Sequence, residues 1–297
     1  MVRRLFWNDL ENRLRIGWRL PFFLPLLAIA LIAVAPFLQI VKLILLVAVT
    51  WLIRRYIDRR DLSSLGLSFY KGWSRDALLG LGLGGLLMSM IFIVELACGW
   101  IDVSGFAWEV HRFDVFLARF FWNALVAMLV VAFSEEIIMR GYLLQTLEEG
   151  FGTRPAVLVS STFFGVLHLI NPTAEGWATY VIPFTLTLAG IMFTFAYLVR
   201  HSLWLPITLH FAWNLFEYDL FGLTGATADH ATFLITKLTG PAVWVGLPDS
   251  AFGPEVGLLG FGAMILGIVL LSLMAKRGNK HTATRGPIKT KVVSSKA

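Results

Sequence analysis

Long apolar runs, each close to the length that crosses a lipid bilayer, recur along this 297-residue chain and constrain its fold more than any other feature. A membrane-spanning helix needs about 20 mostly apolar residues to cross about 30 Å of hydrocarbon. The composition agrees, because 57% of the residues are apolar and 15% are charged, which leaves too few polar groups to cover a soluble protein. With Cys98 as its single cysteine, the chain cannot form an internal disulfide or a cysteine-rich zinc site. The sequence predicts a multi-pass integral membrane protein.

Eight apolar segments are predicted to span the membrane, which gives an all-α polytopic transmembrane helical bundle. These segments are 20–37, 40–53, 77–100, 118–147, 156–170, 178–199, 203–215 and 256–275. Basic residues gather before the first segment, between the second and third, and after the last, whereas the connection 217–255 is mainly acidic. The positive-inside rule therefore predicts that both termini are cytoplasmic, with an even number of spans. The same rule accounts for the net charge of +6, so membrane lipids are the expected partners and nucleic acid is not.

Charged residues within apolar spans are costly, so each group of them is a candidate functional site. The first group is Glu135-Glu136 followed by Arg140. Adjacent helical residues point about 100° apart, whereas Glu136 and Arg140 are i,i+4 neighbours in the favourable order. Arg140 is therefore expected to neutralise Glu136 and to leave Glu135 facing a cavity. A purely structural ion pair would explain Glu136 and Arg140 but would leave the carboxylate of Glu135 without a role.

Two further polar groups lie on later spans, each with an i,i+4 spacing that places its members on one helix face. Phe164 and His168 form one group, and His210 and Asn214 form the other. Taken alone, His168 is typical of a packing residue, and the second group is typical of an interhelical hydrogen bond. Together with Glu135, they are better explained by one shared site.

Such a site has the groups that hydrolysis of a peptide bond needs. A water held between Glu135 and His168 can lose a proton and attack a carbonyl carbon, while His210 and Asn214 stabilise the oxyanion. The motifs His-Glu-x-x-His, Gly-x-Ser-Gly and Gly-x-Gly-Asp of other membrane-embedded hydrolases do not occur in the sequence. Glu135 and His168 must lie at one depth in the bilayer. The fourth helix is therefore predicted to be long, with its 116–125 end outside the core or at the interface.

The three groups together resemble the motifs of a known family, the CPBP intramembrane proteases, which includes type II CAAX prenyl endopeptidases and bacterial bacteriocin-processing or self-immunity (Abi-like) proteins. The motifs are Glu135-Glu136-x-x-x-Arg140, Phe164-x-x-x-His168 and His210-x-x-x-Asn214. The stretch 61–67 also resembles the segment that often precedes the family's core, so the resemblance covers about 60–216. It implies a helical bundle whose catalytic cavity opens within the bilayer, with Glu136 and Arg140 shaping and neutralising the surroundings.

The resemblance implies a role for each remaining residue. Glu135 would be the base that activates water, His168 would assist it, and His210 and Asn214 would form the oxyanion site. Glu135, His168 and His210 could also ligate Zn²⁺ or another divalent metal, since His₂Glu is a known catalytic set. Both alternatives use the same side chains. Metal-free catalysis is favoured because Asn214 suits oxyanion binding better than ligation.

The predicted function is that of a CAAX-type intramembrane endopeptidase, of metallo- or glutamate type, acting on a membrane-associated or prenylated protein or peptide. One alternative is a non-catalytic bacteriocin-immunity or partner-binding membrane protein of the same fold. Another is a proton-coupled transporter, which would show inverted repeats that are not evident in the sequence. If the host is bacterial, the expected location is the plasma membrane.

The predicted organisation has four parts: a basic segment with two transmembrane helices (1–60), a CPBP-like catalytic membrane core (61–217), an extracytoplasmic loop with the last helix (218–275), and a basic disordered tail (276–297). Within the third span, Gly80, Gly82, Gly84 and Gly85 are expected to pack closely against another helix. Glu95, near the outer end of that span, is expected to have a structural role or to reach the interface.

Overall fold

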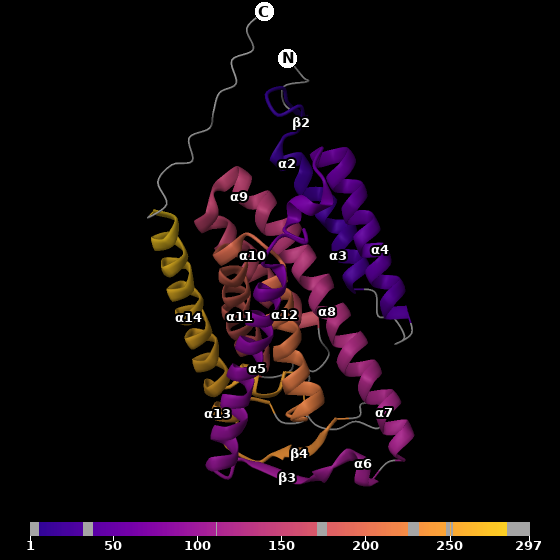
Figure 1. Cartoon of the computed structure of the whole chain (residues 1–297), viewed down its shortest axis with the longest axis vertical. Helices are drawn as coiled ribbons and strands as arrows, with labels where there is room; N and C mark the ends of the chain where they lie inside the picture. The colour runs from indigo at the N-terminus through magenta and orange to yellow at the C-terminus, as the bar shows by residue number, and fades with distance from the viewer. Residues whose placement is uncertain are drawn as a thin grey trace, which may run out of the picture.

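The computed structural model describes residues 6–31, 38–110, 112–170, 177–224, 232–247, 250 and 252–283, and in these the chain forms a helical bundle (Figure 1). Five of its helices are long and apolar enough to cross a membrane. They span Trp73–Ala97, Phe113–Phe151, Thr153–Ile170, Ala178–Arg200 and Leu258–Lys276. These helices coincide with five of the eight predicted spans, and they confirm an all-α polytopic bundle.

Two of these long helices carry more than one label, because the type of helix changes along their length. The long helices are α5 (Trp73–Ala97), α10 (Thr153–Leu167) with η7 (His168–Ile170), α11 (Ala178–Arg200), α14 (Leu258–Ala283), and a composite helix of α7 (Phe113–Phe121), η5 (Trp122–Ala127), α8 (Met128–Glu136), η6 (Ile137–Leu144) and α9 (Gln145–Phe151). In the composite helix, η5 and η6 are π-helical turns. Such turns inside α-helices frequently occur at functional sites, and η6 carries Arg140.

The other three predicted spans correspond to shorter helices. They are α3 (Phe23–Leu31) after α2 (Ile16–Arg19) and η1 (Leu20–Phe22), α4 (Gln39–Leu52) with η3 (Ile53–Asp58), and α12 (Trp204–Asn214) with η8 (Leu215–Leu220). Part of the predicted span 20–37 lies outside the described residues. The total of eight spans therefore stays a prediction.

The predicted length of the fourth helix is confirmed, because the composite helix has 39 residues. At 1.5 Å per residue it is about 58 Å long, roughly twice the hydrocarbon thickness of a bilayer. Its α7 end packs in a small hydrophobic cluster of its own, in which Phe116 and Ala107 are buried. Figure 1 shows the helix running from α9 at one end of the molecule to α7 at the other.

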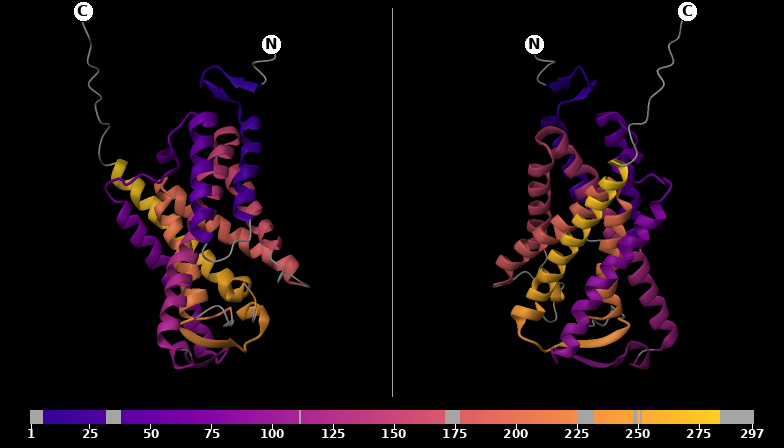
Figure 2. Two further views of the ribbon diagram at one scale, coloured as in Figure 1. Left: turned by 90° about the vertical axis from the view of Figure 1, so that its right-hand side faces the viewer. Right: turned by 60° about the vertical axis from the view of Figure 1, so that its left-hand side comes forward.

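Short strands and helical turns complete the two ends of the bundle. These elements are β1 (Trp7–Asn8), β2 (Arg13–Leu14), η4 (Leu62–Leu65), β3 (Ile101–Phe106), α6 (Ala107–Val110), β4 (Leu234–Leu238), α13 (Ala242–Val245) and η9 (Gly253–Val256). Strand β3 pairs antiparallel with β4, and β1 pairs with β2. The β1–β2 hairpin and the end of α14 lie at one end of the bundle, and β3–β4 lies at the other (Figures 1 and 2). This arrangement agrees with an even number of crossings, while the cytoplasmic placement of the termini stays a prediction.

Close helix contacts place α12 in the middle of the bundle. A Cβ atom at Gly80 would lie 2.4 Å from the carbonyl oxygen of Leu205, and one at Gly84 would lie 2.5 Å from that of Leu209. Only glycine therefore allows α5 to approach α12 this closely. Close packing is confirmed for these two residues and for Gly85, which contacts a phenylalanine ring, but it is wrong for Gly82, which faces open space.

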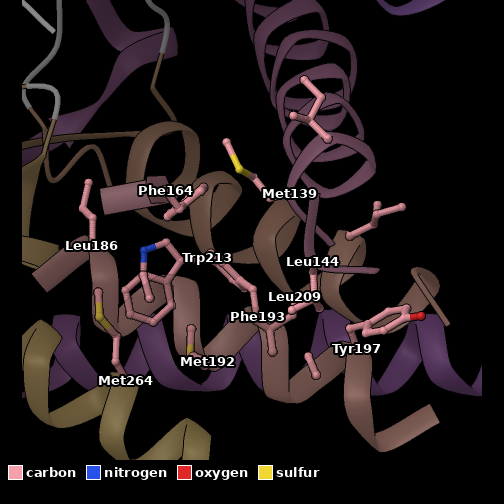
Figure 3. Close-up of a cluster of buried hydrophobic side chains, with 14 of the residues drawn as sticks. Met139, Leu144, Phe164, Leu186, Met192, Phe193, Tyr197, Leu209, Trp213 and Met264 are labelled. Carbon is pink, nitrogen blue, oxygen red and sulfur yellow. The ribbon is translucent and has the colours of Figure 1, made fainter. Parts of the chain in front are cut away.

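Side chains from several helices fill the core. Figure 3 shows the buried side chains of η6, α10, α11, α12 and α14 gathered around Phe164, Phe193 and Trp213. Helices α10 and α11 touch backbone to backbone, because a Cβ atom at Gly165 would lie 2.4 Å from the carbonyl oxygen of Pro183. This packing fixes α8, α10 and α12, the helices that carry the predicted site.

Candidate active site

A buried ion pair on the composite helix forms the back of the site. The Arg140 Nη1 atom lies 2.8 Å from Glu136 Oε1, as the i,i+4 spacing predicts, and both side chains are at most 1% exposed. Arg140 also donates from Nη2 to the carbonyl oxygen of Gly190 at 2.9 Å. Its guanidinium lies over the rings of Phe164 and Phe193, at 4.7 and 5.2 Å from their centroids. Arg140 is therefore held by α11 and α10 as well as by its own helix.

Glu136 in turn holds His210 of α12. The His210 Nδ1 atom lies 2.9 Å from Glu136 Oε1, and Nε2 lies 3.9 Å from Glu135 Oε2. The imidazole stacks on the ring of Phe193, with 4.6 Å between centroids and 15° between planes. Because the Nδ1 atom of His210 binds Glu136, the Nε2 atom on the other side of the ring points towards Glu135.

His168, at the end of α10, is oriented by its own helix. Its Nδ1 atom lies 2.8 Å from the carbonyl oxygen of Phe164. Because a carbonyl oxygen only accepts hydrogen bonds, Nδ1 carries the hydrogen, and in the neutral ring Nε2 is the acceptor. The ring also packs on the side chain of Phe164, with 4.7 Å between centroids. The i,i+4 spacing of these two residues thus fixes the tautomer of His168.

One cavity of about 130 Å³ brings the polar groups of the three helices together. Glu135, His168, His210 and Asn214 all line it. Glu136 and Arg140 do not line it but lie behind His210 and support it. In the described part of the chain, Glu135 Oε2 is buried and has no hydrogen-bond partner, so it is free to accept one from a bound water or substrate.

Sequence reasoning missed four residues that complete the wall of this cavity: Trp213, Tyr218, Phe252 and Glu255. Glu255 belongs to η9 and lies in the acidic connection that was predicted to be an extracytoplasmic loop. Burial raises its pKa to about 8, and the nearby charge of Glu135 raises it further, while the indole of Trp213 opposes the shift. No sequence spacing connects Glu255 with the motifs, so only the fold reveals it.

Two other carboxylates are buried inside the protein. Glu95 was expected to have a structural role or to reach the interface; its side chain is fully buried, which excludes contact with water and leaves the structural role as a prediction. Its carboxylate has no hydrogen-bond partner among the described residues. Glu217, counted among the outward-facing acidic residues, is also fully buried.

The metal alternative needs three ligands gathered around one point. Across the described residues, no group of three or more His, Cys, Asp or Glu side chains is placed to hold a metal ion. Glu135, His168 and His210 line one cavity, but they are not gathered as a set of metal ligands.

Fold and site together define a class of protein. A bundle with five helices long and apolar enough to cross a membrane contains a cavity lined by polar groups, which is the architecture of an integral membrane protein. The model of one protein family, described as type II CAAX prenyl endopeptidase Rce1-like, matches residues 117–216. This segment contains all three motifs. The match confirms, over residues 117–216, the resemblance to the CPBP and CAAX proteases. No curated protein and no solved structure matches the chain.

Proposed function

We propose that this protein is an intramembrane endopeptidase that hydrolyses a peptide bond of a membrane-associated or lipid-modified protein. The family match supports a hydrolase of the CAAX-endopeptidase type. The observation that carries the proposal is the shared cavity, in which a carboxylate oxygen without a partner faces two imidazoles and an amide. A packing role would leave no reason for a carboxylate to be open to a cavity inside the bilayer.

In the proposed mechanism, Glu135 and His168 activate water. The water lies between the open oxygen of Glu135 and the lone pair on His168 Nε2, and it loses its proton to Glu135 as its oxygen attacks the substrate carbonyl carbon. The tautomer of His168 supports this role, because the hydrogen bond to Phe164 leaves Nε2 as an acceptor. The same hydrogen bond fixes the orientation of this ring before substrate binds, which lowers the free-energy cost of reaching the reactive arrangement.

His210 and Asn214 stabilise the negative charge that develops on the carbonyl oxygen. The amide of Asn214 is a neutral donor. His210 becomes a second donor at Nε2 as an imidazolium, because its Nδ1 hydrogen is already given to Glu136. The pair Glu136–Arg140 therefore positions the oxyanion donor.

The test is proteolysis in liposomes with a panel of transmembrane, acylated and prenylated peptides. Glu135→Ala and His168→Ala are compared with wild type, and the exposed Asp114→Asn serves as the control. We expect wild type and the control to cleave at least one peptide and both active-site variants to lose cleavage. A chelator is expected to have no effect. Cleavage that survives both substitutions would show that the site is wrong, and loss of cleavage with the chelator would favour a metal.

Localisation follows from the same proposal. Five apolar helices and the family match support an integral membrane protein. We propose the plasma membrane as its location if the host is bacterial, with the basic segments at the cytoplasmic surface against anionic lipids. Reporter fusions at the two ends of the chain would test the predicted orientation.

A further inference from the structure

A second carboxyl group faces the cavity from the opposite wall. Glu255 lies on η9, between α13 and α14, outside the segment that the family model matches. It lines the same cavity of about 130 Å³ as Glu135. A peptide bond of the substrate that contacts Glu135 in this cavity therefore also lies near Glu255.

Tight backbone packing holds η9 in this position. The Leu247 amide donates to the carbonyl oxygen of Gly253 at 3.0 Å. A Cβ atom at Gly246 would lie 2.0 Å from the same oxygen, and one at Gly257 would lie 2.3 Å from the carbonyl oxygen of Trp244. Larger residues at these positions would push η9 away. The glycines thus fix where the side chain of Glu255 meets the cavity.

The surroundings of Glu255 favour its neutral form. None of the described residues that line the cavity is a lysine or an arginine, so no fixed cation faces this carboxyl. The titratable groups around it are Glu135 on α8, His168 on η7 and His210 on α12, together with Glu217 and Tyr218 on η8. Among these, Glu135 adds a like charge. With burial, this raises the pKa of Glu255 to about 8. At neutral pH the group therefore holds a proton that it can donate.

The reaction needs such a donor. An amine cannot leave as its anion, so the nitrogen must gain a proton as the carbon–nitrogen bond breaks. His168 Nε2 is an acceptor, and the Nδ1 hydrogen is bound to a carbonyl. Tyr218 is a weaker acid than a carboxyl, since an ordinary tyrosine has a pKa of about 10. Glu255 is the carboxyl group of the cavity lining that neither water activation nor oxyanion stabilisation already uses.

We propose that Glu255 is a further catalytic residue, the general acid that protonates the leaving nitrogen; this rests on the proposed function. Glu135 takes one proton from the attacking water, and the oxygen forms a bond to the carbonyl carbon. When the carbon–nitrogen bond breaks, its electron pair stays on nitrogen, which takes the proton of Glu255. The proton on Glu135 then returns to Glu255 across the cavity. One water is consumed, and the products are a carboxylic acid and an amine.

The experiment compares an amide and an ester of the same peptide, namely the peptide of the panel that wild type cleaves. In the second substrate, a phenolic ester replaces the scissile amide. A phenolate leaves without help, because its conjugate acid has a pKa of about 10 or below. Glu255→Gln is expected to lower kcat for the amide by about 10²–10³-fold and for the ester by less than about 10-fold. Glu255→Asp is expected to recover part of the amide activity, and Asp114→Asn is the control.

Two further measurements separate this role from a structural one. The wild-type rate for the amide should fall as pH rises through about 8, where Glu255 loses its proton, and this fall should vanish in Glu255→Gln. Melting in detergent shows whether each variant is folded.

Full amide activity in Glu255→Gln, or equal losses for amide and ester, would overturn the inference while leaving the proposed function intact. Folded wild-type protein that cleaves neither the amide nor the ester would overturn the proposed function and this inference with it.

Discussion

Two clusters of ion pairs lie in this molecule, and they use the same residue types in different proportions. At the end near β1 and β2, Arg19 lies 2.5 Å from Asp58 and 2.7 Å from Glu149. Glu149 also binds Arg13 at 3.0 Å and a third arginine, and Asp58 binds Arg54 at 3.1 Å. Asp58 and Glu149, the two carboxylates at the centre of this arginine cluster, each have two or more arginine partners.

The catalytic cluster has the opposite balance. Arg140 pairs with Glu136 alone, and His210 lies against both Glu136 and Glu135. One carboxylate oxygen of Glu135 is left without a partner beside the cavity. Buried ion pairs hold elements in register when each charge is matched, whereas a surplus carboxylate costs free energy and is retained for chemistry. The ratio of arginine to carboxylate thus separates a structural clamp from a reaction site.

The largest expected effect is on the surplus carboxylate. Glu135→Gln should lower the cleavage rate by about 10⁴-fold, about 5.5 kcal/mol in activation free energy, because the amide cannot take the proton of water. Its unfolding free energy should stay within about 0.5 kcal/mol of wild type, since the open oxygen makes no hydrogen bond in the described structure. Cleavage kinetics measure the change in rate, and melting in detergent measures the change in stability. A marked loss of stability would mean that Glu135 is part of a clamp.

The next effect tests the matched pair of the catalytic cluster. Arg140→Met should lower the free energy of unfolding by about 3–5 kcal/mol, because Glu136 would be left as a buried charge without its partner. Arg200→Met removes a half-exposed arginine, 3.4 Å from Asp76, and should cost less than about 1 kcal/mol. Denaturant titrations of the two variants give the comparison. Equal losses would contradict the importance of burial here.

A smaller effect is expected in the arginine cluster. Glu149→Gln should lower the free energy of unfolding by about 2 kcal/mol, because three arginines lose a charged acceptor. Cleavage per folded molecule should be unchanged, the reverse of the Glu135→Gln result. Glu148→Gln, next to it in the chain, is the control and should have little effect on stability. Loss of cleavage in folded Glu149→Gln would show that the two clusters are coupled.

The last effect concerns pH. The pKa of Glu255 is raised to about 8 in the folded protein, so the folded state prefers the protonated carboxyl. Its contribution to stability is complete below the ordinary pKa of about 4.3 and is lost as pH rises through about 8. Glu255→Gln stays neutral, so it should match wild type at pH 4 and become steadily more stable than wild type as pH rises towards 8. A constant difference between the two proteins at all pH values would contradict this.

The sequence by itself determined the features that depend on local spacing. Apolar runs of bilayer length predict helices because a helix must satisfy its own backbone hydrogen bonds in lipid. The pairing of Glu136 with Arg140, and the placement of His168 over Phe164, follow from the i,i+4 geometry of a single helix. The length of the composite helix followed from the need to bring Glu135 and His168 to one depth.

Only the tertiary structure decided which of these helices meet, and what else reaches the cavity. The hydrogen bond between His210 and Glu136 joins residues 74 positions apart. Glu255 enters the cavity from a connection that was predicted to be a loop, and Glu217, which was expected to face outward, is buried. Helical periodicity determines the direction and the axial position of each side chain along one helix, but it does not determine the distance between two helices. Those distances come from backbone contacts such as that at Gly84, and from a chain that folds back over the end of the bundle.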